Sequence, residues 1–112
     1  MRQNLNNIEP IELEELLAKK DDETILVDIR DKIEIQNEFE DQDNVINLPL
    51  KALDTQYDLL EPFKNKTIVL VCHSGMRAQK AQKFLEKKGF ENLRVLKGGV
   101  VLWEKFKSKK KH

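Results

Sequence analysis

The stretch that most constrains the fold is residues 67–88, which predict a buried strand, a short loop and an amphipathic helix in succession. Residues 67–71 (TIVLV) are an unbroken β-branched and aliphatic run, as in a strand covered on both faces. After the loop at residues 72–77 (CHSGMR), apolar side chains recur at three- and four-residue spacing, which indicates a helix. A buried strand that leads directly into a helix is typical of a parallel α/β sheet.

The rest of the chain repeats this alternation of strand and helix. Further strands are predicted at residues 24–30, 45–50 and 93–96. Helical patterns stand between and after them, at residues 10–20, 53–62 and 100–106. Strands that alternate with helices imply parallel pairing with right-handed crossovers. We expect Trp103, flanked by aliphatic residues, to pack in the core.

Length and composition narrow the class of protein. A chain of 112 residues fits one domain, here 1–112, with residues 1–7 and 107–112 expected to be loose ends. Twenty basic and twenty acidic residues give zero net charge, so we expect no nucleic-acid partner. With no apolar run of membrane-spanning length, no signal-peptide pattern and one cysteine, we expect a cytoplasmic protein without a membrane partner.

Charge is unevenly distributed along the chain. Residues 31–43 hold six acids and a single lysine, whereas residues 105–111 are basic. Such runs are usually solvated surface, and the sequence assigns neither of them a function.

The one cysteine, Cys72, lies directly after the predicted strand at residues 67–71 and just before the predicted helix. A sulfur there faces unpaired backbone amides and the positive end of the helix dipole, which favour a thiolate. Arg77 adds a permanent positive charge, and Gly75 allows the backbone conformations that a loop around an anion requires. The alternative is that Cys72 is simply a small buried apolar residue.

Asp28 and Arg30 end the predicted strand at residues 24–30 and point to the same side of it, because side chains alternate along a strand. Ligands gather at the carboxyl ends of parallel strands, so a functional role is one interpretation. A buried ion pair that supports the neighbouring loop is the interpretation we favour. Glu34 is a candidate partner for Arg30.

The remaining loop side chains have two interpretations. His73 could shuttle a proton or bind an acceptor, or it could simply point into solvent, which we favour. Ser74 and Met76 are expected at the pocket entrance, where their backbone amides matter more than their side chains.

Several of these pieces, in this order, make the chain resemble the rhodanese-like (sulfurtransferase) domain family. The matching pieces are VDIR at 27–30 with Glu34 after it, NLP at 47–49, CHSGMRA at 72–78, and GG at 98–99 followed by Trp103. They span nearly the whole chain. One stretch departs from the family: residues 38–45 (EFEDQDNV) replace its usual Gly-His-Ile-x-Gly-Ala type of sequence, which leaves the pocket rim and partner preference open.

The resemblance implies a three-layer α/β/α domain with a mainly parallel five-stranded sheet. It also implies that Cys72 takes the outer sulfur of a donor such as thiosulfate, holds it as a persulfide and passes it to cyanide or a thiol, including a thiol-bearing protein. No metal or organic cofactor is then expected. The resemblance places Asp28 and Arg30 in support and assigns donor binding to His73, Ser74, Gly75, Met76 and Arg77.

Two other functions stay open. Protein phosphatases and arsenate reductases place five residues between a catalytic cysteine and arginine, whereas this loop has four, residues 73–76, so that chemistry is less favoured. The main alternative is a rhodanese-like persulfide carrier or protein-binding module without appreciable thiosulfate turnover. Binding modules of this family often lack the cysteine, so its presence favours an active site.

Overall fold

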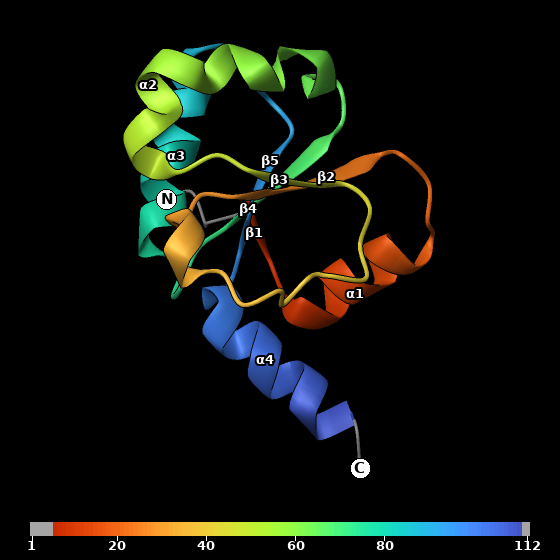
Figure 1. Ribbon diagram of the computed structural model, residues 1–112. Helices are drawn as coiled ribbons and strands as arrows, with labels where there is room; N and C mark the ends of the chain where they lie inside the picture. Colours follow the sequence, from red (N-terminus) through yellow and green to blue (C-terminus); the bar gives the residue numbers. More distant parts are fainter. Residues whose placement is uncertain (1–5, 111–112) are drawn as a thin grey trace, which may run out of the picture.

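The computed structural model describes residues 6–110 and contains one five-stranded sheet (Figure 1). Every strand pairs in parallel with its neighbours, in the order β1-β5-β4-β2-β3. The strands are β1 (Asn7–Ile8), β2 (Thr24–Asp28), β3 (Val45–Asn47), β4 (Thr67–Val71) and β5 (Leu93–Leu96). The predicted α/β class is confirmed, and the sheet is wholly parallel.

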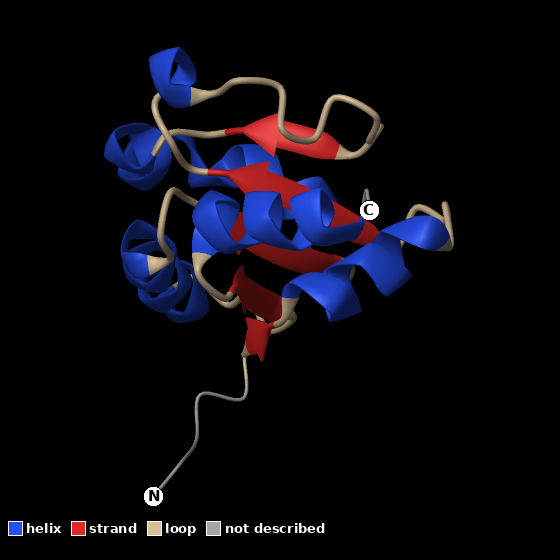
Figure 2. Cartoon of the chain, turned by 90° about the horizontal axis from the view of Figure 1, so that it is seen from below, coloured by secondary structure: helices blue, strands red, loops and turns tan. Residues whose placement is uncertain are grey.

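Helices cover both faces of this sheet, so the predicted three layers are confirmed (Figures 1 and 2). The α-helices are α1 (Pro10–Ala18), α2 (Leu53–Gln56), α3 (Met76–Lys87) and α4 (Gly99–Lys110). Short 3-10 helices are formed by Lys32–Glu34, Leu50–Ala52 and Tyr57–Phe63. Helices α1 and α4 pack on one face of the sheet and α2 and α3 on the other.

The core consists of two apolar clusters that the sheet separates. Along β4, Ile68 and Leu70 join the cluster under α2 and α3, whereas Val69 and Val71 join the one under α1 and α4. This division follows from the two-residue period of a strand, and it explains why β4 has no polar face. Trp103 of α4 is 3% exposed, as expected for a core residue.

Glycines set the two ends of α3. The helix begins after Gly75, whose φ is +108°, and ends just before Gly89, whose φ is +91°. Both values lie in the left-handed region that side chains disfavour. A glycine is therefore suited to the position where this helix ends.

The chain ends are more ordered than the sequence indicates. Asn7 and Ile8 form β1, which pairs with Val95 and Leu96 of β5, so Asn7 is not part of a loose end. Helix α4 continues to Lys110, and residues 107–110 are likewise not loose. The physical reasons are the burial of Ile8 and the contacts that Lys107 and Lys110 make with Glu14 of α1, at 3.4 and 2.6 Å. Residues 1–5 and 111–112 of the expected loose ends lie outside the described residues.

The helix expected at 53–62 is also different. Only Leu53–Gln56 is α-helical, and the chain continues as the 3-10 segment Tyr57–Phe63. Pro62 lies inside that segment and has no N–H to donate, which works against a continuous α-helix there.

Candidate active site

The thiol of Cys72 lies at the carboxyl end of β4, at the centre of the loop that leads into α3. Its Sγ accepts the backbone N–H of Gly75 at 3.0 Å and that of Ala78 at 3.4 Å. Cys72 is only 1% exposed. The amides of the loop and of the first helical turn therefore converge on one atom, as expected, and this arrangement suits a negatively charged sulfur.

Backbone hydrogen bonds from the start of α4 fix the backbone of the cysteine loop. The N–H of Val100 donates to the carbonyl oxygen of Cys72 at 2.9 Å, and the N–H of Val101 donates to that of His73 at 3.1 Å. Gly99 makes this approach possible, since a Cβ there would collide with both carbonyl oxygens. The sequence pattern marked Gly98 and Gly99 only as one piece of the family resemblance and did not reveal this role, although a glycine pair between strand and helix is itself a signal of close backbone approach.

Arg77 is engaged in an ion pair. Its Nη1 and Nη2 donate to the two carboxylate oxygens of Glu34, at 2.9 and 2.7 Å, and each side chain is about a third exposed. These bonds, with the N–H of Asp31 as a further donor, lower the pKa of Glu34 to about 2. The pKa of Arg77 is raised, chiefly by Glu34 and to a smaller extent by Cys72.

Glu34 is therefore not the ionic partner of Arg30, contrary to expectation. Only its backbone carbonyl oxygen accepts from Arg30 Nη1, at 3.4 Å. The 3-10 turn at Lys32–Glu34 directs the carboxylate toward α3 instead, where it meets Arg77.

Arg30 lies between two other carboxylates. It donates to both oxygens of Asp28, at 2.9 and 2.7 Å, and to both oxygens of Glu38, at 2.9 and 3.2 Å. Asp28 and Arg30 are each 2% exposed, so they form the buried ion pair that we favoured. Arg30 also lowers the pKa of Glu38. The role of Glu38 was missed, because nothing in the acidic run of residues 31–43 distinguishes this acid from its neighbours.

Asn47 completes this support. Its Nδ2 donates to the carbonyl oxygens of Asp28 and Arg30, each at 2.9 Å, across the β2–β3 pair. The turn that follows β2 is thereby fixed beside the cysteine loop.

The other loop side chains face outward. His73 and Ser74 are exposed, and Met76 is 73% exposed. His73 also borders a cavity of about 250 Å³ beside the loop. The cavity is lined by Arg30, Glu34, Gln36, Glu38, His73, Val100, Val101 and Glu104.

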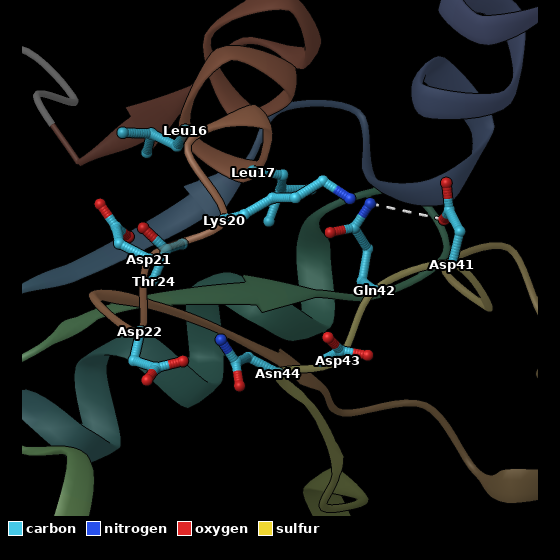
Figure 3. Close-up of a pocket in the computed structure, with 10 residues that line it drawn as sticks. All are labelled: Leu16, Leu17, Lys20, Asp21, Asp22, Thr24, Asp41, Gln42, Asp43 and Asn44. Atoms are coloured by element: carbon cyan, nitrogen blue, oxygen red, sulfur yellow. Dashed lines mark hydrogen bonds between the residues drawn. The ribbon is translucent and has the colours of Figure 1, made fainter.

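A second, smaller cavity of about 70 Å³ lies at the opposite edge of the sheet, next to the start of β2 (Figure 3). The carboxylates of Asp21, Asp22, Asp41 and Asp43 surround it, and Lys20 extends toward Gln42. Within residues 6–110, no three His, Cys, Asp or Glu side chains are grouped to hold a metal ion. Over the same residues, no helix is long and apolar enough to cross a membrane.

Comparison with known families gives a match over most of the chain. The family described as "Rhodanese-like domain" matches residues 9–106, which include the cysteine loop and the ends of β2 and β5. The chain belongs to the rhodanese-like domain family.

Solved rhodanese-like structures share the fold. A rhodanese-related protein of Thermoplasma volcanium superposes with a TM-score of 0.72 at 24% identity, covering 89% of this chain and 91% of that one. A rhodanese-like domain protein of Staphylococcus aureus gives 0.68 at 26% identity, over 88% and 91%. A single-domain sulfurtransferase of Saccharomyces cerevisiae gives 0.68 at 19% identity, over 92% and 91%, and this similarity supports the fold alone.

Curated relatives are longer proteins. A tRNA uridine(34) hydroxylase of Pelagibacter ubique is 34% identical over 106 residues, which are 94% of this chain and 34% of that protein. The Buchnera aphidicola protein of the same name is 32% identical over 83 residues, 70% of this chain and 26% of that protein. The rhodanese-like chain therefore spans about a quarter to a third of the length of these relatives.

Proposed function

We propose that this rhodanese-like protein is a cytoplasmic sulfurtransferase that moves a sulfane sulfur from a donor such as thiosulfate to cyanide or a thiol, through a persulfide on Cys72. The observation that carries the proposal is the position of Cys72 Sγ, which accepts the amides of Gly75 and Ala78 at the end of a buried strand. Amide donors and a helix N-terminus favour a thiolate, the form of cysteine that acts as a nucleophile.

The first half-reaction takes sulfur from the donor. The Cys72 thiolate attacks the outer sulfur of thiosulfate, an S–S bond forms, and the bond between the two donor sulfurs breaks. Sulfite leaves with that electron pair. In this proposal the loop amides that point at Sγ also stabilise the charge of the persulfide.

The second half-reaction releases the sulfur. Cyanide or a thiolate attacks the outer sulfur of the persulfide, thiocyanate or a new persulfide leaves, and the Cys72 thiolate is restored. Atoms and charges balance in both steps without an external oxidant or a metal.

The other predicted site residues take supporting parts in this proposal. The backbone of residues 73–77 forms the donor cradle, with His73, Ser74 and Met76 at its entrance. Arg77 lies within electrostatic range of Cys72 and ties the loop to the turn at Lys32–Glu34. Asp28 and Arg30 fix the neighbouring turn.

The test is intact-mass spectrometry after incubation with millimolar thiosulfate and, separately, with an alkyl persulfide. We expect a gain of about 32 Da, one sulfur atom, that dithiothreitol reverses. The Cys72→Ser variant should show no gain. A folded wild-type protein that gains no sulfur from either donor would contradict the proposal. A phosphotyrosine mimic in a parallel assay tests the phosphatase alternative, for which we expect no hydrolysis.

A second candidate is a persulfide-carrier or protein-binding module without appreciable thiosulfate turnover. Two strongly exposed apolar side chains favour it, since Ile33 is 93% and Met76 is 73% exposed, each adjacent in sequence to one member of the Glu34–Arg77 pair. A carrier would form the persulfide once but release little thiocyanate. Steady-state turnover with thiosulfate and cyanide therefore separates the two candidates.

A further inference from the structure

The positive charges beside Cys72 are offset by carboxylates. Arg77 is bound by both oxygens of Glu34, and Arg30 lies between Asp28 and Glu38. Glu104 adds another carboxylate to the cavity beside the loop. Together these six side chains carry four carboxylates and two guanidinium groups, so neither arginine is without a carboxylate partner. Lys51 likewise has a carboxylate partner, since its Nζ lies 3.7 Å from a carboxylate oxygen of Asp31, the residue after Arg30.

The burial of Cys72 determines which part of a donor meets these charges. With Cys72 1% exposed, a donor can bring only a narrow terminal atom, its sulfane sulfur, to Sγ. The remainder of the donor must stay outside, on the side of Arg77 and its partner Glu34. The charge next to the sulfane sulfur is therefore the property that this site senses.

Thiosulfate is unfavourable in this respect, because its negatively charged sulfonate end would remain among carboxylates. Like charges that lie close together in a partly solvated site repel each other, and the repulsion is weaker where water screens them. Arg77 would offset this repulsion if its guanidinium were available, but Glu34 already shares that charge.

Building on the proposed sulfurtransferase activity, we propose that Glu34 is a specificity-determining residue. By binding Arg77, its carboxylate biases the Cys72 site against small dianionic donors. The bias favours persulfides that carry a positive charge beside the sulfane sulfur, such as those of aminothiols. In that reaction the Cys72 thiolate bonds to the outer sulfur of R–S–SH, the S–S bond of the donor breaks, and R–S⁻ leaves with the electron pair while the outer sulfur keeps its proton.

The experiment compares three donors on the full chain. They are thiosulfate and two persulfides of similar length and opposite charge, made from cysteamine and from 3-mercaptopropionate. The second-order rate of Cys72 persulfidation is followed by quenched intact-mass measurement. Each rate is divided by the rate of the same donor with 2-mercaptoethanol, which removes differences in intrinsic reactivity.

We expect the wild type to react about tenfold faster with the cysteamine persulfide than with the 3-mercaptopropionate persulfide. Glu34→Gln should reduce that preference. The same variant should react about tenfold faster with thiosulfate than the wild type does. Glu61→Gln is the matched control, because it also removes one carboxylate from an exposed ion pair, here with Lys64. This pair shortly precedes the amino-terminal end of β4, whereas Cys72 follows its carboxyl end. Its rates should equal those of the wild type.

A double variant, Glu34→Gln with Arg77→Gln, tests the role of the freed guanidinium. The gain with thiosulfate should disappear, because it requires Arg77.

Three results would overturn the inference while leaving sulfur transfer in place: equal normalised rates for the two wild-type persulfides, a Glu34→Gln rate with thiosulfate no higher than that of Glu61→Gln, or a gain that survives in the double variant. Absence of a Cys72 persulfide with every donor would instead overturn the proposed function, and this inference with it.

Discussion

At the scale of single residues, the position of Cys72 depends on Gly99. The φ of Gly99 is +59°, and the backbone there lies against the carbonyl groups of Cys72 and His73. Any side chain at this position would separate the start of α4 from the loop. A residue that does no chemistry thus controls where the sulfur sits.

We expect Gly99→Ala to lower the free energy of unfolding by roughly 2 kcal/mol and to slow persulfidation of the folded protein, because the new methyl group must displace the loop backbone. Urea denaturation and the mass assay measure the two effects. Gly89→Ala is the control: its φ is also positive, but the nearest atom to a Cβ there is the end of the flexible Lys64 side chain, at 3.3 Å. It should cost stability without changing the rate. Equal rates for Gly99→Ala and wild type would show that the loop does not need this contact.

At the scale of elements, the acidic segment between β2 and β3 is held in place rather than freely solvated. Glu34 binds Arg77, Glu38 binds Arg30, and the Phe39 ring lies 5.2 Å from that of Trp103. The segment therefore packs over the turn after β2 and against α4. Its acidic sequence gives no sign of these three contacts.

These attachments make stability sensitive to acid. The pKa of Glu34 falls from 4.5 to about 2 in the folded protein, because Arg77 and the Asp31 amide bind its charged form. A lowered pKa means that the contribution is complete above pH 4.5 and is lost as the pH falls toward 2. The lowered pKa of Glu38 acts in the same direction. We expect the free energy of unfolding to decrease from pH 4.5 to pH 2.5, and the decrease to be smaller in Glu34→Gln.

Urea denaturation at pH 7, 4.5, 3.5 and 2.5 would measure this difference. Glu61→Gln again serves as the control, because it removes a carboxylate from an exposed ion pair with Lys64, and its pH dependence should match that of the wild type. A parallel decrease in all three proteins would show that Glu34 does not contribute to acid sensitivity.

Sequence patterns predicted the parts of the fold that are encoded locally. Strands β2 and β4 contain the aliphatic runs at 25–27 and 68–71, and the helix after Cys72 has regular apolar spacing. Strand β1 has only two residues, one of them polar, and owes its conformation to pairing with β5, so no local pattern marks it. In the site, the convergence of amides on Cys72 was predictable from the join of strand and helix. The Glu34–Arg77 pair was not, because 43 residues separate its members.

At the scale of the whole molecule, the sheet lies between the two apolar clusters and packs against both. Its edge strand β1 contributes more to stability than its two residues indicate. Ile8 of β1 is 1% exposed and belongs to the cluster under α1 and α4. Strand β1 also precedes α1 directly, so its pairing with β5 determines where that helix begins.

We expect Ile8→Ala to lower the free energy of unfolding by about 3 kcal/mol, the usual effect of emptying a buried isoleucine site. Ile33→Ala is the matched control, because the same side chain is 93% exposed there and its loss should change stability by less than about 0.5 kcal/mol. Thermal and urea unfolding measure both. A small effect of Ile8→Ala would mean that β1 is dispensable for the fold.

The single tryptophan of the chain follows the start of α4 by four residues, and α4 begins with the amides that hold the cysteine loop. The ring of Trp103 also stacks on Phe39 of the acidic segment. The protein's one tryptophan thus contacts the segment that borders the site and belongs to the helix whose first amides bind the cysteine loop. Its emission can be recorded without any label, during titration with donors or acceptors as well as during unfolding.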